Sequence, residues 1–267
     1  MDPLLIKHRL LEIGRKACDI IRIRFNPLGQ PTEYKEGKTL ASQVVTAVDR
    51  ELNQFITGEL MNGYPSYGIR SEESEETAGN RYCFVVDPLD GTLNFQRGFP
   101  HCGVSLALVD QQEDQVLVGV VVEPYQNIEY SACRYGGAFV GHPSQGFPIE
   151  PTRVFLPKRR LKESFIVCGG TKVFLDGRLE QMRESFGFVV TCRSIAFEIS
   201  TIASGGHDGG VLMSTDLPYD HQAAGLIAAE GGAIVTELDG SPWNAKSTTM
   251  ITGSPAVHAK LLEIFNP

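Results

Sequence analysis

The spacing of apolar residues changes along the chain, and each spacing predicts a different kind of element. Apolar residues recur at helical spacing over residues 4–25 and again over residues 49–61. Proline and glycine follow both segments, which predicts that each helix ends there. The chain is therefore expected to begin with two amphipathic helices that precede a sheet.

The middle of the chain is rich in strand patterns. Short apolar runs bounded by turn residues predict strands over residues 67–70, 82–87, 104–109, 115–122, 128–133 and 138–140. The later runs follow one another without helical segments between them, which predicts a meander. The segment 141–162 contains four prolines and predicts a loop or junction.

After this junction, strand and helix patterns alternate. The predicted strands cover residues 164–168, 188–191, 209–212 and 233–236, and the predicted helices cover residues 172–186, 195–204, 220–230 and 255–265. Consecutive strands followed by alternating strands and helices indicate stacked layers of helix and sheet. A single domain over residues 1–267 is expected, with room for two lobes that would meet near 141–162.

Composition and charge narrow the class of function. The chain has 24 basic and 32 acidic residues and a net charge of −8, so neither nucleic acid nor a membrane is an expected partner. Apolar runs long enough to span a bilayer are missing, and charge comes too early at the N-terminus for a signal peptide. The six cysteines lack the spacing of a disulfide framework or a zinc site. We therefore expect a cytoplasmic protein.

The strongest local signal is an acidic turn with the sequence D-P-L-D-G-T-L-N-F. A buried apolar strand ends at Asp87, and proline and glycine then force a turn that brings Asp90 beside it. Two carboxylates held so close repel each other unless a cation lies between them. Carboxylates suit Mg²⁺, and the Leu89 carbonyl in the middle of the turn is available as a further oxygen ligand. Gly91 and Thr92 stand where a helix can begin and offer backbone amides to an anion.

Simpler explanations exist for each acidic segment. The sequence D-P-x-D-G also satisfies an ordinary surface turn. The acids at 72–76 follow a predicted strand, but a run of this kind also forms solvated faces. Thr46 with Asp49, and separately Asp220, stand where helices are predicted to begin, and a simple capping role would explain them.

Taken together, these segments resemble the inositol monophosphatase family of Mg²⁺-dependent, Li⁺-sensitive sugar phosphatases. The resemblance covers nearly the whole chain and rests on V-T-A-V-D at 45–49, S-E-E-S at 71–74, D-P-L-D-G-T-L-N-F at 87–95 and D-H-Q-A-A-G at 220–225. The third segment, D-P-L-D-G-T-L-N-F, is highly specific for this family. The resemblance implies an α+β fold, a layered αβαβα sandwich, and a homodimer.

The resemblance also implies which residues form the site. The implied ligands of two or three Mg²⁺ ions are Glu72, Asp87, the Leu89 carbonyl, Asp90 and Asp220. Thr92, with Asp49 behind it, would hold and polarise the attacking water, and Glu72 would help. The amides of Gly91 and Thr92 would hold the phosphate, and Lys38 would lie near the phosphate and the outer metal.

Departures from the family pattern concern the substrate. Met213 stands where inositol-specific members carry a glutamate that grips sugar hydroxyls, although Asp216 could substitute for it. Arg193 replaces a family glycine before Ser194, and its guanidinium would bind a carboxylate or second phosphate of the substrate, or point into solvent or a subunit contact. Arg193, Ser194 and Met213 are therefore candidate substrate contacts. Tyr219 stands where the family usually has tryptophan.

The expected function is hydrolysis of a small polyol or sugar phosphate by metal-activated water. Alternatives on the same fold are phosphatases for 3′-phosphoadenosine 5′-phosphate, histidinol phosphate or fructose 1,6-bisphosphate. A non-catalytic regulatory homologue that binds a macromolecule is a further alternative, and retention of the acids and Thr92 argues against it. We expect His221 to support the site or lie at the surface, and we assign His101 and His207 no role.

Overall fold

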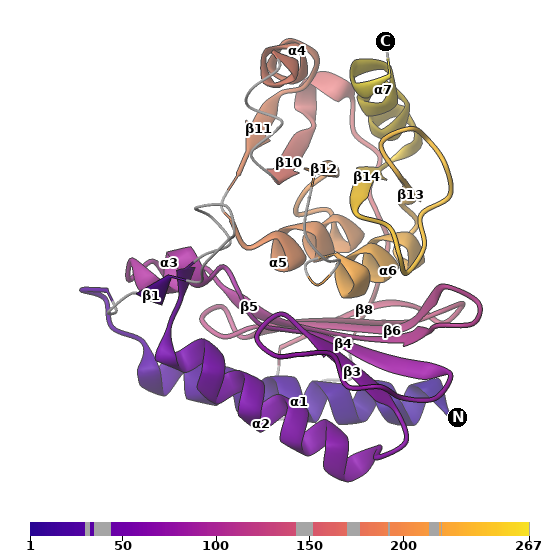
Figure 1. Ribbon diagram of the computed structural model, residues 1–267. Coiled ribbons are helices and arrows are strands. Elements are labelled where there is room, and N and C mark those ends of the chain that lie inside the picture. The colour runs from indigo at the N-terminus through magenta and orange to yellow at the C-terminus, as the bar shows by residue number, and fades with distance from the viewer. Residues whose placement is uncertain are drawn as a thin grey trace.

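Helices and sheets alternate in five layers (Figure 1). The structure is a computed structural model that describes residues 1–29, 33–34, 44–142, 152–169, 177–191, 193–213, 219 and 221–266. The described α-helices are α1 (Pro3–Arg24), α2 (Ala47–Gly63), α3 (Thr92–Gln96), α4 (Arg178–Ser185), α5 (Ile195–Ser200), α6 (Gln222–Glu230) and α7 (Pro255–Phe265). From bottom to top, Figure 1 shows α1 with α2, a large sheet, α5 with α6, a second sheet, and α4 with α7. This order confirms the expected αβαβα sandwich of the α+β class.

Local capping interactions position the two helices of the bottom layer. The Asp2 carboxylate accepts hydrogen bonds from the Leu4 amide, 2.9 Å away, and the Leu5 amide, and so begins α1. Thr46 caps α2 in a capping box, in which its side chain bonds the Asp49 amide and the Asp49 side chain bonds the Thr46 amide. The capping box fixes Asp49 in the first turn of α2, beside the large sheet.

The large sheet has seven strands in sequence order. They are β3 (Gly68–Ser71), β4 (Tyr82–Asp90), β5 (Gly103–Asp110), β6 (Gln115–Glu123), β7 (Ile128–Cys133), β8 (Gly137–Gly141) and β9 (Thr152–Val154). Strand β3 runs parallel to β4, and the other neighbours pair antiparallel, as the predicted meander requires. Alternate side chains enter different cores: Val86 packs toward α1 and α2, whereas Val85 packs toward α5 and α6.

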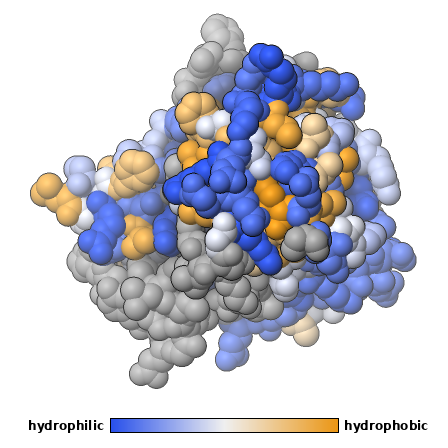
Figure 2. All heavy atoms as spheres, turned by 90° about the horizontal axis from the view of Figure 1, so that it is seen from above, coloured by the Kyte–Doolittle hydropathy of each residue, from blue (hydrophilic) through white to orange (hydrophobic). Residues whose placement is uncertain are grey.

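The second sheet has five strands in the order β11-β10-β12-β14-β13. They are β10 (Phe165–Gly169), β11 (Phe188–Val190), β12 (Gly209–Met213), β13 (Ile234–Thr236) and β14 (Thr249–Gly253). Strand β10 pairs parallel with β11 and β12, and β14 pairs antiparallel with β12 and β13. Seen from above, the top of the molecule mixes hydrophilic and apolar residues (Figure 2).

Some boundaries differ from the predictions. The segment 141–162, predicted as a loop, contains β9 at the edge of the large sheet and a 3-10 turn, η2 (Leu161–Glu163). The predicted helix 195–204 is α5 followed by a tighter 3-10 turn, η4 (Thr201–Ser204). A small two-stranded sheet, β1 (Glu33–Tyr34) with β2 (Val44–Val45), precedes α2. Among the described helices, none is long and apolar enough to cross a membrane.

Candidate active site

An irregular step at the carboxyl end of β4 places two aspartates on one face of the large sheet. Asp87 pairs with Ser105, and Asp90 pairs with Gly103. Three positions on β4 therefore face two positions on β5, which is the signature of a one-residue bulge. Because side chains alternate between faces, this extra residue turns Asp87 and Asp90 to the same side. The Leu89 amide donates to the Asp87 carboxylate at 3.0 Å, within the predicted turn.

The buried carboxylate of Asp90 connects the large sheet to α5. One oxygen accepts from the Ile195 amide at 2.9 Å, and the other accepts from the Ser194 hydroxyl at 2.8 Å and the Phe197 amide at 3.2 Å. Burial raises the pKa of Asp90 to about 7, and the hydrogen bonds from Ser194 and Phe197 oppose that rise. Ser194 is thus a direct partner of a predicted metal ligand.

A second network joins Thr92 to Asp49. The Thr92 hydroxyl lies 2.9 Å from an Asp49 carboxylate oxygen and 3.0 Å from the Leu89 carbonyl oxygen. The other Asp49 oxygen accepts from the Thr46 amide at 2.7 Å and from the Thr46 hydroxyl. Burial raises the pKa of Asp49 to about 6, against the hydrogen bonds from Thr46 and Thr92. Asp49 therefore caps its helix and also accepts a hydrogen bond from Thr92.

Glu72 reaches the site from the neighbouring strand. Its amide donates to the Val86 carbonyl oxygen at 3.1 Å, which places Glu72 just after β3 and alongside Asp87. The preceding Ser71 side chain turns the other way and donates to Asn53 of α2 at 2.7 Å. Glu72 is half-buried, whereas Glu76 is exposed and pairs with Arg70. The acidic run therefore divides: Glu72 stands beside Asp87 at the end of the sheet, whereas Glu76 pairs with Arg70 at the surface.

The turn between β4 and α3 is packed too closely for a side chain at Gly91. Gly91 has a φ of +90°, and a Cβ atom there would lie 3.0 Å from the His101 carbonyl oxygen and 3.2 Å from the Arg193 carbonyl oxygen. Arg193 itself is exposed and has a φ of +64°, the left-handed region that favours glycine. The Arg193 backbone therefore borders the turn that precedes Thr92.

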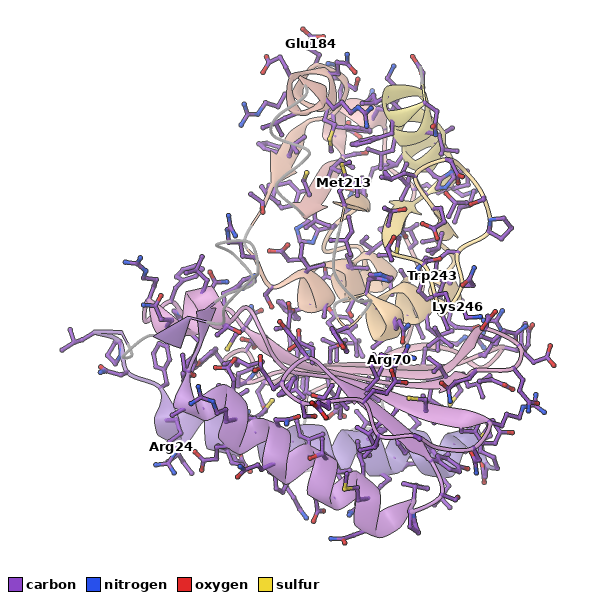
Figure 3. All side chains as sticks on the ribbon, in the orientation of Figure 1. Arg24, Arg70, Glu184, Met213, Trp243 and Lys246 are labelled. Atoms are coloured by element: carbon purple, nitrogen blue, oxygen red, sulfur yellow. The ribbon has the colours of Figure 1, made fainter. Side chains whose placement is uncertain are left out.

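The other predicted substrate contacts lie farther along the chain. Met213 ends β12 and packs against the core of the second sheet. Figure 3 shows Met213 above the helix layer and Arg70 below it. Tyr219 is half-buried, and burial raises its pKa to about 12. The predictions for Lys38, Asp216 and Asp220 lie outside the described residues.

The donor set of the described site consists of oxygen atoms. It comprises the carboxylates of Glu72, Asp87 and Asp90 and the Leu89 carbonyl. Within the described ranges, no group of three or more His, Cys, Asp and Glu side chains is gathered closely enough to hold a metal ion. Mg²⁺ is commonly held by one or two carboxylates, with water and substrate phosphate completing its shell. The residues present therefore fit Mg²⁺.

Two histidines take part in contacts that the sequence did not reveal. His101 Nε2 lies 3.3 Å from the carboxylate of buried Glu198 in α5, and this hydrogen bond raises the pKa of His101. The partners are 97 positions apart, and a histidine before a predicted strand is no signal of such a pair. His221 is fully buried and accepts from Trp243 Nε1 at 3.4 Å, so it does not lie at the surface.

Known proteins match the chain over most of its length. The sequence profile of the inositol monophosphatase family matches residues 7–266. A Thermotoga maritima protein named fructose-1,6-bisphosphatase/inositol-1-monophosphatase is 29% identical over 100% of this chain and 96% of its own length. The inositol-1-monophosphatase of Rhizobium meliloti is 30% identical over 86% of this chain and 92% of its own. The solved structure of a Thermotoga maritima IMPase has a TM-score of 0.85 at 26% identity and covers 100% of this chain and 97% of that one.

Proposed function

Since the chain belongs to the inositol monophosphatase family, a family of phosphatases, we propose that it is a Mg²⁺-dependent phosphomonoesterase that hydrolyses a small polyol or sugar phosphate. One observation carries this proposal. The bulge in β4 turns Asp87 and Asp90 to one face, next to the bonded pair of Thr92 and Asp49. Paired carboxylates are able to hold metal ions that activate water, and a positioned hydroxyl is able to orient that water.

We propose that two or three Mg²⁺ ions occupy the site. Their ligands would be Glu72, Asp87, the Leu89 carbonyl, Asp90 and Asp220, with Lys38 near the outer ion and the phosphate. Bound Mg²⁺ supplies charge neutralisation of the phosphate, a lower pKa for the attacking water and stabilisation of the leaving alkoxide. It also explains how a chain with a net charge of −8 binds a phosphate dianion.

The residues of the chain would position water and phosphate. When Thr92 donates its single hydrogen to Asp49, its oxygen lone pairs remain able to accept a hydrogen bond from a water molecule. Glu72, which comes from the neighbouring strand, would accept the second hydrogen of that water. The Gly91 and Thr92 amides at the start of α3 would hold the phosphate oxygens. Such positioning removes much of the entropic barrier to attack.

Phosphate release tests the proposal. The purified protein is incubated with inositol 1-phosphate, fructose 1,6-bisphosphate, histidinol phosphate and 3′-phosphoadenosine 5′-phosphate, in Mg²⁺, in Mg²⁺ with Li⁺, and in EDTA. We expect turnover of at least one ester, loss of it in EDTA and inhibition by Li⁺. Absence of turnover on every ester in Mg²⁺ would contradict the proposal and favour a non-catalytic regulatory homologue.

A substrate with a second anionic group is a further candidate, favoured by Arg193. A non-glycine residue at a φ of +64° is strained, and such strain concentrates at functional sites. The residue borders the Gly91 turn, and one relative is named for both bisphosphate and monophosphate hydrolysis. Arg193→Gly is expected to lower kcat/KM for fructose 1,6-bisphosphate about tenfold or more while sparing inositol 1-phosphate. An equal effect on both substrates would argue against this role.

Two further expectations concern the whole protein. We propose that it is a homodimer and that it acts in the cytoplasm, as the family resemblance and the sequence favour. Sedimentation velocity at micromolar concentration tests the first, and a species of about 58 kDa, twice the 29.2 kDa of one chain, is the expected result. A species of the single-chain mass would contradict it.

A further inference from the structure

A cavity lies between the beginning of α1 and the turn that joins β7 to β8. Its volume is about 350 Å³, and its lining includes Asp2, Leu4, Lys7, Cys133, Arg134 and Phe139. Figure 1 shows the beginning of α1 at the opposite end of the large sheet from α3, so this amino-terminal cavity is separate from the candidate active site. Its volume falls at the lower end of the range for small-molecule sites, about 300–1,000 Å³.

Lys7 gives the amino-terminal cavity a charged group in an unusual setting. Only 6% of Lys7 is exposed, although lysine is among the residues that are rarely buried. Its ammonium group lies 4.5 Å from the centre of the Phe139 ring. Among the described residues, no carboxylate forms an ion pair with it. The cation–π contact compensates only part of the cost of burying a charge, and an anion would compensate more of it.

The other charged groups of the cavity are already engaged. The Asp2 carboxylate accepts from the Leu4 and Leu5 amides as the cap of α1. Arg134 lies over the Tyr135 ring and donates to the Val116 carbonyl oxygen at 3.4 Å. The Glu230 carboxylate also reaches the β7–β8 turn, where it accepts from the Tyr135 and Gly137 amides. Both nearby carboxylates therefore serve backbone amides, and Lys7 keeps no carboxylate partner among the described residues, which favours a negatively charged occupant beside it.

The apolar part of the lining indicates the rest of the occupant. Leu4 is 53% exposed and Phe139 is partly exposed. Cys133 lines the cavity, and its thiol donates to the Pro3 carbonyl oxygen at 3.5 Å. We propose that the amino-terminal cavity binds a small organic carboxylate, with its carboxylate on the Lys7 ammonium and its flat apolar body against Phe139 and Leu4.

Benzoate is the probe that tests this site. Binding to the Mg²⁺-loaded protein is measured by ligand-observed NMR, with benzylamine as a probe of the same shape and opposite charge. Lys7→Met keeps the apolar stem and removes the charge, and Lys16→Met, an exposed lysine of the same helix, is the matched control. We expect benzoate to bind the wild type and Lys16→Met, to bind Lys7→Met at least about tenfold more weakly, and benzylamine not to bind.

A second measurement does not depend on the stability of the Lys7 variant. Alkylation of Cys133 in the wild-type protein is followed by peptide mass spectrometry with and without benzoate. Bound benzoate is expected to slow modification of Cys133 at least about threefold, as site occupancy above two thirds would. Unchanged benzoate affinity in Lys7→Met, or no protection of Cys133 at saturating benzoate, would overturn the proposal. Phosphatase activity plays no part in either readout.

Discussion

The carboxylate of Asp90 links the large sheet to α5 in the helix layer above it. Its two oxygens accept three hydrogen bonds from Ser194 and the first turn of α5. Burial disfavours its charge, while these donors, and a cation when one is bound, favour it. Asp90 therefore has both a structural task and a proposed task in metal binding. Replacing it distinguishes a metal site from an ordinary turn.

Replacing Asp90 by asparagine is expected to damage both tasks. The amide group would face a hydrogen-bond donor of α5 and would contribute no charge to a metal ion, so kcat falls at least about a hundredfold. The free energy of unfolding falls by about 1–3 kcal/mol. Asp110→Asn is the matched control, because Asp110 is a buried, hydrogen-bonded aspartate at the other end of the same strand pair. Near-normal activity of Asp90→Asn at saturating Mg²⁺ would contradict this role.

The hydroxyl of Thr92 should matter for the chemical step. Thr92→Ala removes the group that Asp49 orients, and we expect kcat to fall about a hundredfold or more with little change in the Mg²⁺ requirement. Thr92→Ser keeps the hydroxyl and should retain activity within about tenfold. Steady-state kinetics at saturating Mg²⁺ measure both variants, and equal activities in Ala and Ser variants would remove Thr92 from the mechanism.

For single residues, the sequence predicts contacts between partners that lie close together along the chain. Asp87, Asp90 and Thr92 lie in one turn, and the capping pair of Thr46 and Asp49 is three positions apart, so their sequence spacing already limits their geometry. Contacts such as His101 with Glu198 depend on how α5 docks on the sheet, and no spacing along the chain encodes that docking.

At the scale of elements, the bulge of β4 determines which way the acids point. Without the extra residue, Asp87 and Asp90 would lie on opposite faces of the sheet. Gly91 lies in the turn that follows. Its positive φ and the nearby carbonyl oxygens of His101 and Arg193 both disfavour a side chain there. The geometry of the site thus depends on two backbone irregularities in succession.

Gly91→Ala tests the turn. A Cβ atom meets the His101 carbonyl oxygen at 3.0 Å, and alanine disfavours a φ of +90°, so we expect a loss of about 1–3 kcal/mol in the free energy of unfolding and a lower kcat. Gly58→Ala is the control, because Gly58 lies inside α2 with open space around its Cβ position and should gain up to about 1 kcal/mol. Urea unfolding measures both, and an unharmed Gly91→Ala would refute the packing described.

Most elements are predictable because their apolar patterns are long and regular. Helices α1, α2 and α7 and strands β5 to β8 lie within a few residues of their predicted positions. Strand β9 was missed because three residues among prolines carry no period, and its pairing with β8 is what makes it a strand. The change from α5 to η4 likewise reflects packing, since the apolar pattern continues through both.

At the scale of the molecule, the site spans layers that come from both halves of the chain. The large sheet provides Asp87 and Asp90, whereas α5 in the second half provides the donors to Asp90. The shared core of Val85, Phe197 and Leu226 also joins sheet and helices. We therefore propose that residues 1–267 form one cooperative unit, with the two lobes joined at this layer.

Unfolding followed with two spectroscopic probes tests this cooperativity. Trp243 is the only tryptophan and reports on the second half of the chain, whereas far-ultraviolet circular dichroism reports on all of it. We expect coincident transitions, and a gain of about 2.7 kcal/mol when Mg²⁺ is present at a hundred times its Kd. Separate transitions would show that the lobes unfold independently, and equal stability with Mg²⁺ and EDTA would argue against a resident ion.

Anomalous diffraction from crystals grown with Mn²⁺, which prefers the same oxygen ligands as Mg²⁺, tests whether the acids from distant parts of the chain share bound ions. We expect anomalous peaks within about 2.0–2.6 Å of carboxylate oxygens of Asp87 and Asp90, with Glu72 and Asp220 at the same ions. A crystal that shows no peak at the bulged end of β4, or that places Glu72 and Asp220 away from the ions bound there, would contradict this expectation.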